Sequence, residues 1–285
     1  MESFEAPSGA RIHVNPDDQA GQRALARGGP KDREQRLWSF LANELSYQAV
    51  YDLGANYGQV TLGAAYPPET EVVLVEPNPQ LVPYLQRSIE THPNREQIKL
   101  HSLALGNHDG SANLFIRTEA QGKSSLVQER GESTPVPLTT LDALASPSAG
   151  TRDAIIKLDV EGSELALLEG AAETLSGFDN YAIMIELHPG YMRMTADSVG
   201  RYVELLCSYG RLWEQNKSGA VKPFDFARFV RRGKLHDILI VSGDRYTAQI
   251  REAKRRIDRP PRQAAEAPAV EHGGTLHRLR QRLAR

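Results

Sequence analysis

Residues 50–61 read Val-Tyr-Asp-Leu-Gly-Ala-Asn-Tyr-Gly-Gln-Val-Thr. A short run rich in β-forming residues stops at Gly54, and a helical pattern over 59–65 follows Gly58. A second β-rich run occupies 71–75. Strand, glycine turn, helix and second strand in this order are typical of the first βαβ unit of a nucleotide-binding α/β fold.

The same alternation continues along most of the chain. The apolar patterns predict strands at 50–53, 71–75, 98–105, 154–159, 181–187 and 237–241, and helices at 32–46, 59–65, 80–91, 162–175 and 196–209. They indicate an α/β fold with a doubly wound, mostly parallel sheet and helices on both faces. We expect 111–117 and 135–138 to pair as an edge hairpin around the polar loop 118–134, which fits either a substrate lid or a plain surface hairpin.

The charge of the chain is unevenly distributed. The 285 residues carry a formal net charge of −2, but residues 245–285 hold eleven Arg or Lys against four Asp or Glu, so this part is +7 and the rest is −9. We therefore expect a flexible lead-in over 1–31, a folded domain over 32–244 and a basic, partly disordered tail over 245–285. An acidic body would repel phosphates, so nucleic acid is not an expected partner.

The composition also bears on location. No stretch approaches the roughly 20 apolar residues of a membrane span, and residues 1–30 lack the apolar segment of a secretory signal, so we expect a cytoplasmic protein. The pattern over 275–283 allows weak contact of the tail with an anionic membrane, although a solvated tail is favoured. Cys207 is the single cysteine, and we expect it on the packed face of a helix. The oligomeric state is not indicated.

The glycine turn indicates which cofactor the fold binds. A dinucleotide fingerprint reads Gly-x-Gly-x-x-Gly, whereas this turn has only Gly54 and Gly58, preceded by Asp52. A carboxylate there would repel a pyrophosphate and would suit a cationic amine. S-adenosylmethionine has such an amine and a sulfonium, and its carboxylate suits backbone N–H groups at the start of a helix over 57–61. Glu76, at the end of the next strand, can accept the ribose hydroxyls. The pattern favours S-adenosylmethionine over NAD(P).

Six sequence blocks resemble the successive motifs of the FkbM family of S-adenosylmethionine-dependent methyltransferases. They are Asp52-Leu-Gly-Ala-Asn-Tyr-Gly-Gln-Val-Thr61, Val75-Glu-Pro-Asn-Pro79, Leu103-Ala-Leu-Gly-Asn107, Ser124-Ser-Leu126, Thr140-Leu-Asp142 and Ile156-Lys-Leu-Asp-Val-Glu-Gly-Ser-Glu164. The resemblance covers about residues 48–190. It implies a class I methyltransferase (Rossmann-like) sheet of seven strands with the last antiparallel, and methyl transfer to a hydroxyl of a sugar, glycolipid, polysaccharide or secondary metabolite. The donor-binding residues expected from the turn and these motifs are Asp52, Gly54, Ala55, Asn56, Gly58, Thr61, Glu76, Asn78, Ala104 and Asp159.

The candidate catalytic residues follow the fourth and fifth strands, where ligands bind in open α/β sheets. Asp159 and Glu161 end the fourth strand, and His188 ends the fifth. Histidine exchanges protons near neutral pH, so His188 is the first choice for the base, with Asp159 and Glu161 orienting the acceptor or the methyl donor. Lys157 would need a carboxylate partner inside the sheet, and Asp159 on the same strand face is the expected one.

Three alternatives remain open at this stage. A divalent cation held by Asp159, Glu161, Glu186 and His188 would polarise the acceptor hydroxyl, although the local spacing does not build such a site and no metal is favoured. A catalytically silent scaffold in a biosynthetic complex would keep the fold without turnover. An NAD(P)-dependent dehydrogenase is disfavoured by the missing third glycine and by Asp52.

Overall fold

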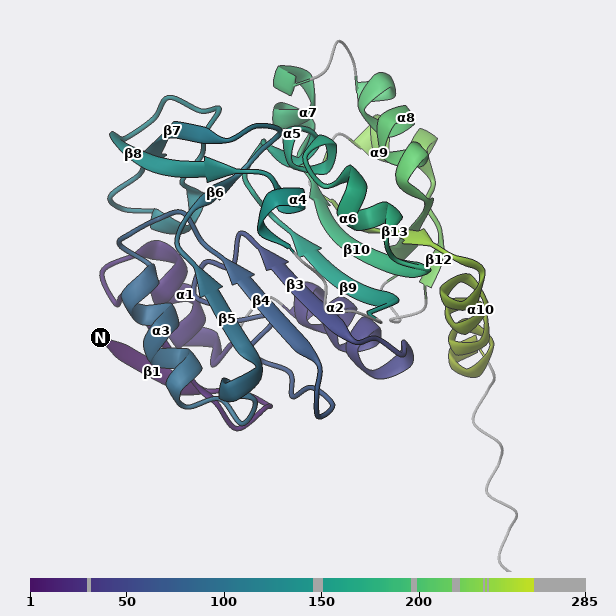
Figure 1. The fold of residues 1–285 in the computed structure, drawn as a ribbon, viewed down its shortest axis with the longest axis horizontal. Helices are drawn as coiled ribbons and strands as arrows, with labels where there is room; N and C mark the ends of the chain where they lie inside the picture. Colours follow the sequence, from purple (N-terminus) through teal and green to yellow (C-terminus); the bar gives the residue numbers. More distant parts are fainter. Residues whose placement is uncertain are drawn as a thin grey trace, which may run out of the picture.

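The computed structural model describes residues 1–29, 32–145, 151–195, 199–216, 221–232, 234 and 236–258. Its centre is an eight-stranded sheet in the order β12-β11-β13-β10-β9-β3-β4-β5 (Figure 1). The strands are β3 (Ala49–Leu53), β4 (Glu71–Val75), β5 (Ile98–His101), β9 (Asp153–Leu158), β10 (Asn180–Leu187), β11 (Arg211–Gln215), β12 (Val221–Pro223) and β13 (His236–Ser242).

The topology confirms the predicted mostly parallel α/β sheet. β5, β4, β3, β9 and β10 run parallel, β13 is antiparallel to β10, and β11 is antiparallel to β13. Without β12 the strands, numbered along the chain, lie in the order 6-7-5-4-1-2-3. The predicted count of seven omits β12, a three-residue strand antiparallel to β11 at the sheet edge.

Helices cover both faces because the central strands are apolar on both sides. Every residue of β3 and β9 is buried, as is usual in parallel sheets between helical layers. On one face Val50 belongs to the core cluster of α2 (Asp32–Glu44), and on the other Tyr51 packs with α5 (Glu164–Glu169), α6 (Ala172–Ser176) and α8 (Val199–Tyr209). Helix α8 turns Cys207 to solvent, so the prediction that this cysteine is buried is wrong.

A separate three-stranded sheet lies beside the carboxyl ends of the central strands (Figure 1). It contains β6 (Ala104–Leu105), β8 (Glu132–Thr139) and β7 (Gly110–Ile116), and β7 pairs antiparallel with β8. The predicted edge hairpin is thereby confirmed. The predicted strand 98–105 is instead two strands in two sheets, because the chain leaves the central sheet after His101.

The N-terminal segment is part of the fold, so the prediction of a flexible lead-in over 1–31 is wrong for its described residues. It forms a hairpin of β1 (Glu2–Glu5) and β2 (Arg11–Val14), then α1 (Gln19–Arg27). Ile12 and Val14 are fully buried against the core cluster that includes α3 (Val82–Glu90). Two apolar positions in a four-residue strand are too few for a sequence pattern to separate from a polar loop.

The expected basic tail begins inside a helix. α10 (Asp244–Asp258) packs on the central sheet through Tyr246, Ile250 and Ala253, which recur at helical spacing and are buried. The predicted boundary between 244 and 245 therefore does not end the folded domain. The remainder of the predicted tail, 259–285, including the amphipathic pattern at 275–283, lies outside the described residues. Within the part of the chain that the structure describes, no helix is both long and apolar enough to cross a membrane.

Candidate active site

The turn after β3 requires glycine for a steric reason. Gly54 has φ 87°, and a Cβ built there would lie 1.9 Å from the carbonyl oxygen of Asp159, after the neighbouring strand β9. Asn56 and Gly58 also have left-handed backbones, with φ of 55° and 71°, a region that asparagine and glycine tolerate best. The turn therefore brings the ends of β3 and β9 into direct contact.

The helix predicted over 59–65 does not form. Residues 57–64 are turns, with one helical hydrogen bond from Leu62 N to Gly58 O at 2.8 Å. The left-handed Gly58 at its start prevents a regular helical entry. The predicted helix N-terminus over 57–61, which was expected to receive the donor carboxylate, is therefore absent.

A buried ion pair lies beneath the turn. Lys157 Nζ is 3.1 Å from Asp52 Oδ1, 3.7 Å from Asp159 Oδ2, and donates to Gly54 O at 2.8 Å. Burial alone lowers the pKa of Lys157, but the carboxylates of Asp52 and Asp159 outweigh it and raise the pKa above its usual range. The closer partner of Lys157 is thus Asp52 on the neighbouring strand, not the predicted Asp159. Asp52 is fully buried beside this ammonium, and its Oδ2 has no hydrogen-bond partner among the described residues.

Glu76 faces the turn from the end of β4. Its Oε2 accepts from Asn56 N at 2.7 Å and its Oε1 from Asn78 N at 2.8 Å. Burial raises the pKa of Glu76 to about 7, although both backbone donors oppose the shift. Each carboxylate oxygen keeps acceptor capacity for a further donor.

Two cavities open at this edge of the sheet. The first, which we call the donor cavity, has about 590 Å³ of space, and the second, the acceptor cavity, about 960 Å³. Both volumes include space that is open to solvent. The residues lining both cavities are Asn56, Gly122, Asp159 and Glu161.

The donor cavity is mainly apolar, with polar groups at one end. Its apolar wall comes from the strand ends and the small sheet: Val75, Pro77, Leu81, Leu103, Ala104, Leu105, Leu114, Leu126 and Val160. Of the predicted donor residues, those that line it are Gly54, Asn56, Glu76, Ala104 and Asp159. Ala55 lines the acceptor cavity, whereas Asp52, Gly58, Thr61 and Asn78 lie behind the walls as supports.

Glu161 stands in the wall between the cavities in an unusual conformation. Its φ is 49°, which is uncommon for a residue other than glycine. Ser125 Oγ donates to its carbonyl at 2.6 Å, and Tyr191 OH donates to its Oε2 at 2.8 Å. Burial, reinforced by the Asp159 carboxylate, raises the pKa of Glu161 well above the usual range of a carboxyl. Backbone strain held by surrounding contacts is frequent at active sites.

His188 is placed differently from the prediction. It lines neither cavity, and its ring lies against Tyr191 at a centroid distance of 4.5 Å. Its Nδ1 accepts from Gly190 N at 3.1 Å. This backbone hydrogen bond engages one of the two ring nitrogens. The predicted role as base is therefore not supported by the position of His188.

Several residues that line the acceptor cavity were not among the predicted site residues. Helix α1 contributes Gln19, Ala20, Arg23 and Arg27, α2 contributes Glu34, and the loop after β7 contributes Lys123. The loop was marked in the sequence by the polar run over 118–134, which fits either a lid or a plain hairpin, and by the Ser124-Ser-Leu126 block. No sequence pattern marked α1, because its contacts with the rest of the site are distant in sequence.

One carboxylate connects three walls of the site. Asp18 caps α1 by accepting from Ala20 N and Gly21 N, each at 3.0 Å. The same side chain accepts from Tyr57 OH at 3.2 Å and from Gln121 N at 2.7 Å. Asp18 is fully buried, so α1, the glycine turn and the loop after β7 share one fixed anchor.

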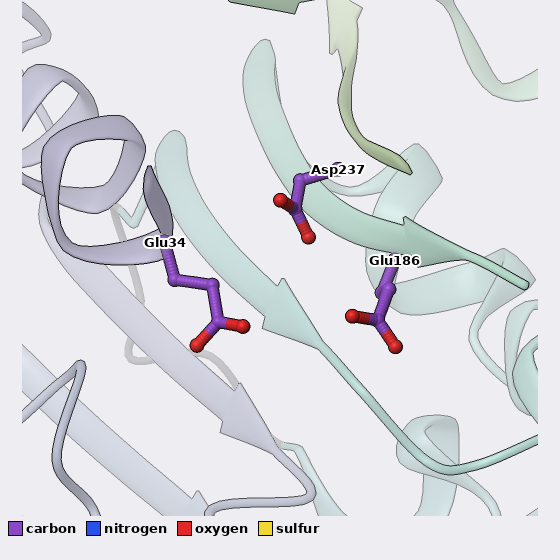
Figure 2. A group of neighbouring side chains, drawn as sticks. All are labelled: Glu34, Glu186 and Asp237. Atoms are coloured by element: carbon purple, nitrogen blue, oxygen red, sulfur yellow. The ribbon is translucent and has the colours of Figure 1, made fainter. Parts of the chain in front are cut away.

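An acidic group lies beside the acceptor cavity. Carboxylate oxygens of Glu34, Glu186 and Asp237 lie within 4.8 Å of one another and point toward a common centre (Figure 2). Arg33 Nε is 3.3 Å from Asp237 Oδ2 and compensates part of this charge. Of the predicted metal ligands only Glu186 belongs to this group, and among the described residues Asp159, Glu161 and His188 do not gather with it.

Comparison with known proteins identifies the family. The model of the methyltransferase FkbM domain matches residues 52–212, more than half of the chain. The chain belongs to the FkbM methyltransferase family. A search of curated proteins gave no match.

Solved structures resembling the FkbM domain are distant in sequence. The methyltransferase FkbM from Methylobacillus flagellatus KT is 16% identical, with 73% of this chain and 48% of that chain covered and a TM-score of 0.46. TomG, an O-methyltransferase from Streptomyces achromogenes in complex with SAM, is 10% identical, with coverages of 74% and 80% and a TM-score of 0.42. A putative O-methyltransferase from Klebsiella pneumoniae is 13% identical, with coverages of 80% and 91% and a TM-score of 0.42. This chain thus spans about half the length of the FkbM structure that it matches.

The family match covers most of the residues that line the two cavities. The matched region begins at Asp52 and includes the glycine turn, the loop after β7 and Glu161. Helices α1 and α2 lie outside it, yet both line the acceptor cavity. The residues of the acceptor cavity that lie outside the matched region are therefore those contributed by α1 and α2.

Proposed function

We propose that the protein is an S-adenosylmethionine-dependent methyltransferase that transfers a methyl group to a hydroxyl of a sugar or another metabolite. The observation that carries this proposal is the position of Glu161, a carboxylate of raised pKa in the wall shared by two cavities. A base between a donor and an acceptor is what methyl transfer to an alcohol requires. Membership of the FkbM family supports the reaction class.

The donor cavity fits S-adenosylmethionine in its residue chemistry. Glu76 keeps acceptor capacity for a ribose diol, and the apolar wall suits the adenine ring. Asp159 lines both the donor and the acceptor cavity, and its carboxylate suits a cationic group. Bound there, S-adenosylmethionine supplies an electrophilic methyl group and leaves as S-adenosylhomocysteine.

The protein's own part is orientation and proton transfer. Glu161 receives the proton of the acceptor hydroxyl, and Tyr191 and Ser125 hold Glu161 in its strained position. We keep Asp159 as the group that orients the acceptor or the donor. His188 then acts as packing for Tyr191, not as the base.

The test is binding and turnover with defined probes. S-adenosylhomocysteine should bind with a micromolar Kd in calorimetry, and methyl-labelled S-adenosylmethionine should label a member of a panel of sugars, glycosides and phosphorylated sugars. Binding of NADH in place of S-adenosylhomocysteine would reverse the choice of cofactor. Binding without labelling of any panel member or of native extracts would favour the scaffold alternative.

Glu76 makes donor binding depend on pH. Ribose hydroxyls donate to the charged carboxylate, so binding favours deprotonation of a group whose pKa is about 7. The affinity for S-adenosylhomocysteine should rise as pH increases through 7, level off above it, and be accompanied by proton release. Calorimetry in buffers of different ionisation enthalpy measures that release. Glu76→Gln should remove the pH dependence, and an equally strong dependence in this variant would contradict the assignment.

Methyl transfer should persist after metal removal. The guanidinium of Arg33 already compensates Asp237 in the acidic group, and Glu161 needs no cation to accept a proton. We expect turnover within twofold of the starting value after exhaustive EDTA treatment. Loss of turnover that Mg²⁺ or Mn²⁺ restores, and that Glu186→Gln abolishes, would instead establish the acidic group as a metal site.

A further inference from the structure

A third cavity, which we call the basic cavity, lies on the other side of the start of α2 from the acceptor cavity. It has about 1270 Å³ of space and is formed by α2, β11, β12, β13 and α9 (Phe226–Arg232). Its lining holds one carboxylate, Glu214, and six cationic side chains: Arg33, Arg36, Lys222, Arg228, Arg232 and Lys234.

Most of this positive charge has no counter-charge in the described chain. Lys222 Nζ pairs with Glu214 Oε1 at 2.5 Å, and Arg33 pairs with Asp237. The remaining four cations, Arg36, Arg228, Arg232 and Lys234, form no ion pair within the residues that the structure describes. Cations that converge on a concave surface concentrate positive potential there and attract anions.

The positive charge of the cavity also affects the pKa of His236, which lines it. Its Nε2 lies 2.8 Å from Glu214 Oε2, a contact that alone favours the charged ring. Burial nevertheless lowers the pKa of His236, and the guanidinium groups of Arg33 and Arg228 add to that effect. The cavity therefore disfavours one more positive charge even beside a carboxylate.

The basic cavity and the acceptor cavity share a thin wall. On α2, Arg33 lines the basic cavity and Glu34 the acceptor cavity. On β13, His236 lines the basic cavity, whereas the next residue, Asp237, faces Glu34 and Glu186 (Figure 2). The two cavities are therefore lined by neighbouring residues of α2 and are separated at β13 by neighbouring residues.

We propose that the basic cavity binds the phosphate or diphosphate group of the methyl acceptor, so that the substrate is a phosphorylated or diphosphate-linked alcohol. This rests on the proposed function. Four cations have no ion pair within the described chain, which is more positive charge than a ligand with a single carboxylate would balance. Arginine side chains also match phosphate oxygens in bidentate geometry. Free diphosphate and a nucleoside diphosphate sugar both carry this diphosphate group, so the experiment below compares the binding of the two.

The first experiment measures binding of inorganic pyrophosphate and of a nucleoside diphosphate sugar to the full chain by calorimetry at fixed ionic strength. We expect saturable binding that Arg228→Ala/Arg232→Ala weakens at least tenfold. The matched control is Arg231→Ala, an exposed arginine of the same helix outside the cavity lining, which should change Kd less than twofold. Tighter binding of the sugar nucleotide than of pyrophosphate would identify the larger ligand as the occupant.

A second measurement uses the unmodified protein. Added pyrophosphate should raise the pKa of His236 in an NMR titration and leave the chemical shifts of the exposed His108 unchanged. No saturable binding, equal weakening by Arg231→Ala, or an unshifted His236 would overturn the proposal. Binding of S-adenosylhomocysteine to the unmodified protein is measured in parallel. Absence of this binding would refute the proposed function. Binding of S-adenosylhomocysteine without binding of pyrophosphate would refute only the proposal of a phosphorylated acceptor.

Discussion

Glu161→Gln is expected to lower the turnover number by about 10²- to 10⁴-fold, the usual contribution of a general base. Glutamine keeps the size of the side chain and can still accept the hydrogen bond from Tyr191, so the wall between the cavities should keep its shape. The affinity for S-adenosylhomocysteine should therefore change little. Single-turnover rates with an acceptor from the labelling screen, together with calorimetry, separate these two effects.

The pH profile gives an independent readout of the same group. A base must be deprotonated, and burial raises the pKa of Glu161, so activity should fall as pH decreases through a value above the ordinary glutamate pKa of about 4.3. This acid limb should disappear from the residual activity of Glu161→Gln. Glu169→Gln, at an exposed position of α5, is the control and should behave as the unmodified enzyme. If His188→Ala abolishes turnover and Glu161→Gln does not, the base is His188.

Lys157→Met is expected to destabilise the protein by about 3–5 kcal/mol, because it leaves the buried Asp52 carboxylate without its cation. The side chains of Lys157 and Asp52 are 7% and 1% exposed, so water cannot replace the lost partner. The free energy of unfolding in urea measures the effect. The exposed pair of Lys99 and Glu71, at 2.8 Å with Lys99 65% exposed, provides the control: Lys99→Met should cost less than about 1 kcal/mol.

A double variant separates loss of the pair from loss of packing. Asp52→Asn combined with Lys157→Met removes both charges, so it should be more stable than Lys157→Met alone. A cost of Lys157→Met below about 1 kcal/mol, similar to that of Lys99→Met, would show that the buried pair has no special weight. Equal instability of the single and double variants would assign the loss to packing.

The sequence predicted the parts of the fold that depend on local pattern. Buried parallel strands such as β3 and β9 are continuous apolar runs. Gly54 and Glu76 follow such runs directly, so their place at the carboxyl edge of the sheet could be predicted, and both line a cavity there. The helix over 59–65 failed because its apolar spacing does not reveal the left-handed backbone at Gly58. β12, with three residues, is too short to show any period.

Contacts between distant residues were beyond the sequence pattern. Lys157 had a carboxylate two positions away, and nothing in the local pattern favoured Asp52, which lies 105 positions away. The walls contributed by α1 and the choice between His188 and Glu161 depend in the same way on tertiary packing. Such residues can be assigned to the site only when the carboxyl ends of several strands have been placed together at one edge of the sheet.

The anchor at Asp18 also sets an order of assembly during synthesis. α1 leaves the ribosome early, but Gln121, the partner of Asp18 across the site, follows 103 positions later, and Glu161 later still. Chains are synthesised at about 5–20 residues per second, so α1 waits several seconds with only its own cap and the Tyr57 hydroxyl as partners of Asp18. The residues of α1 and of the glycine turn are therefore synthesised well before Gln121 and Glu161, which line the donor cavity.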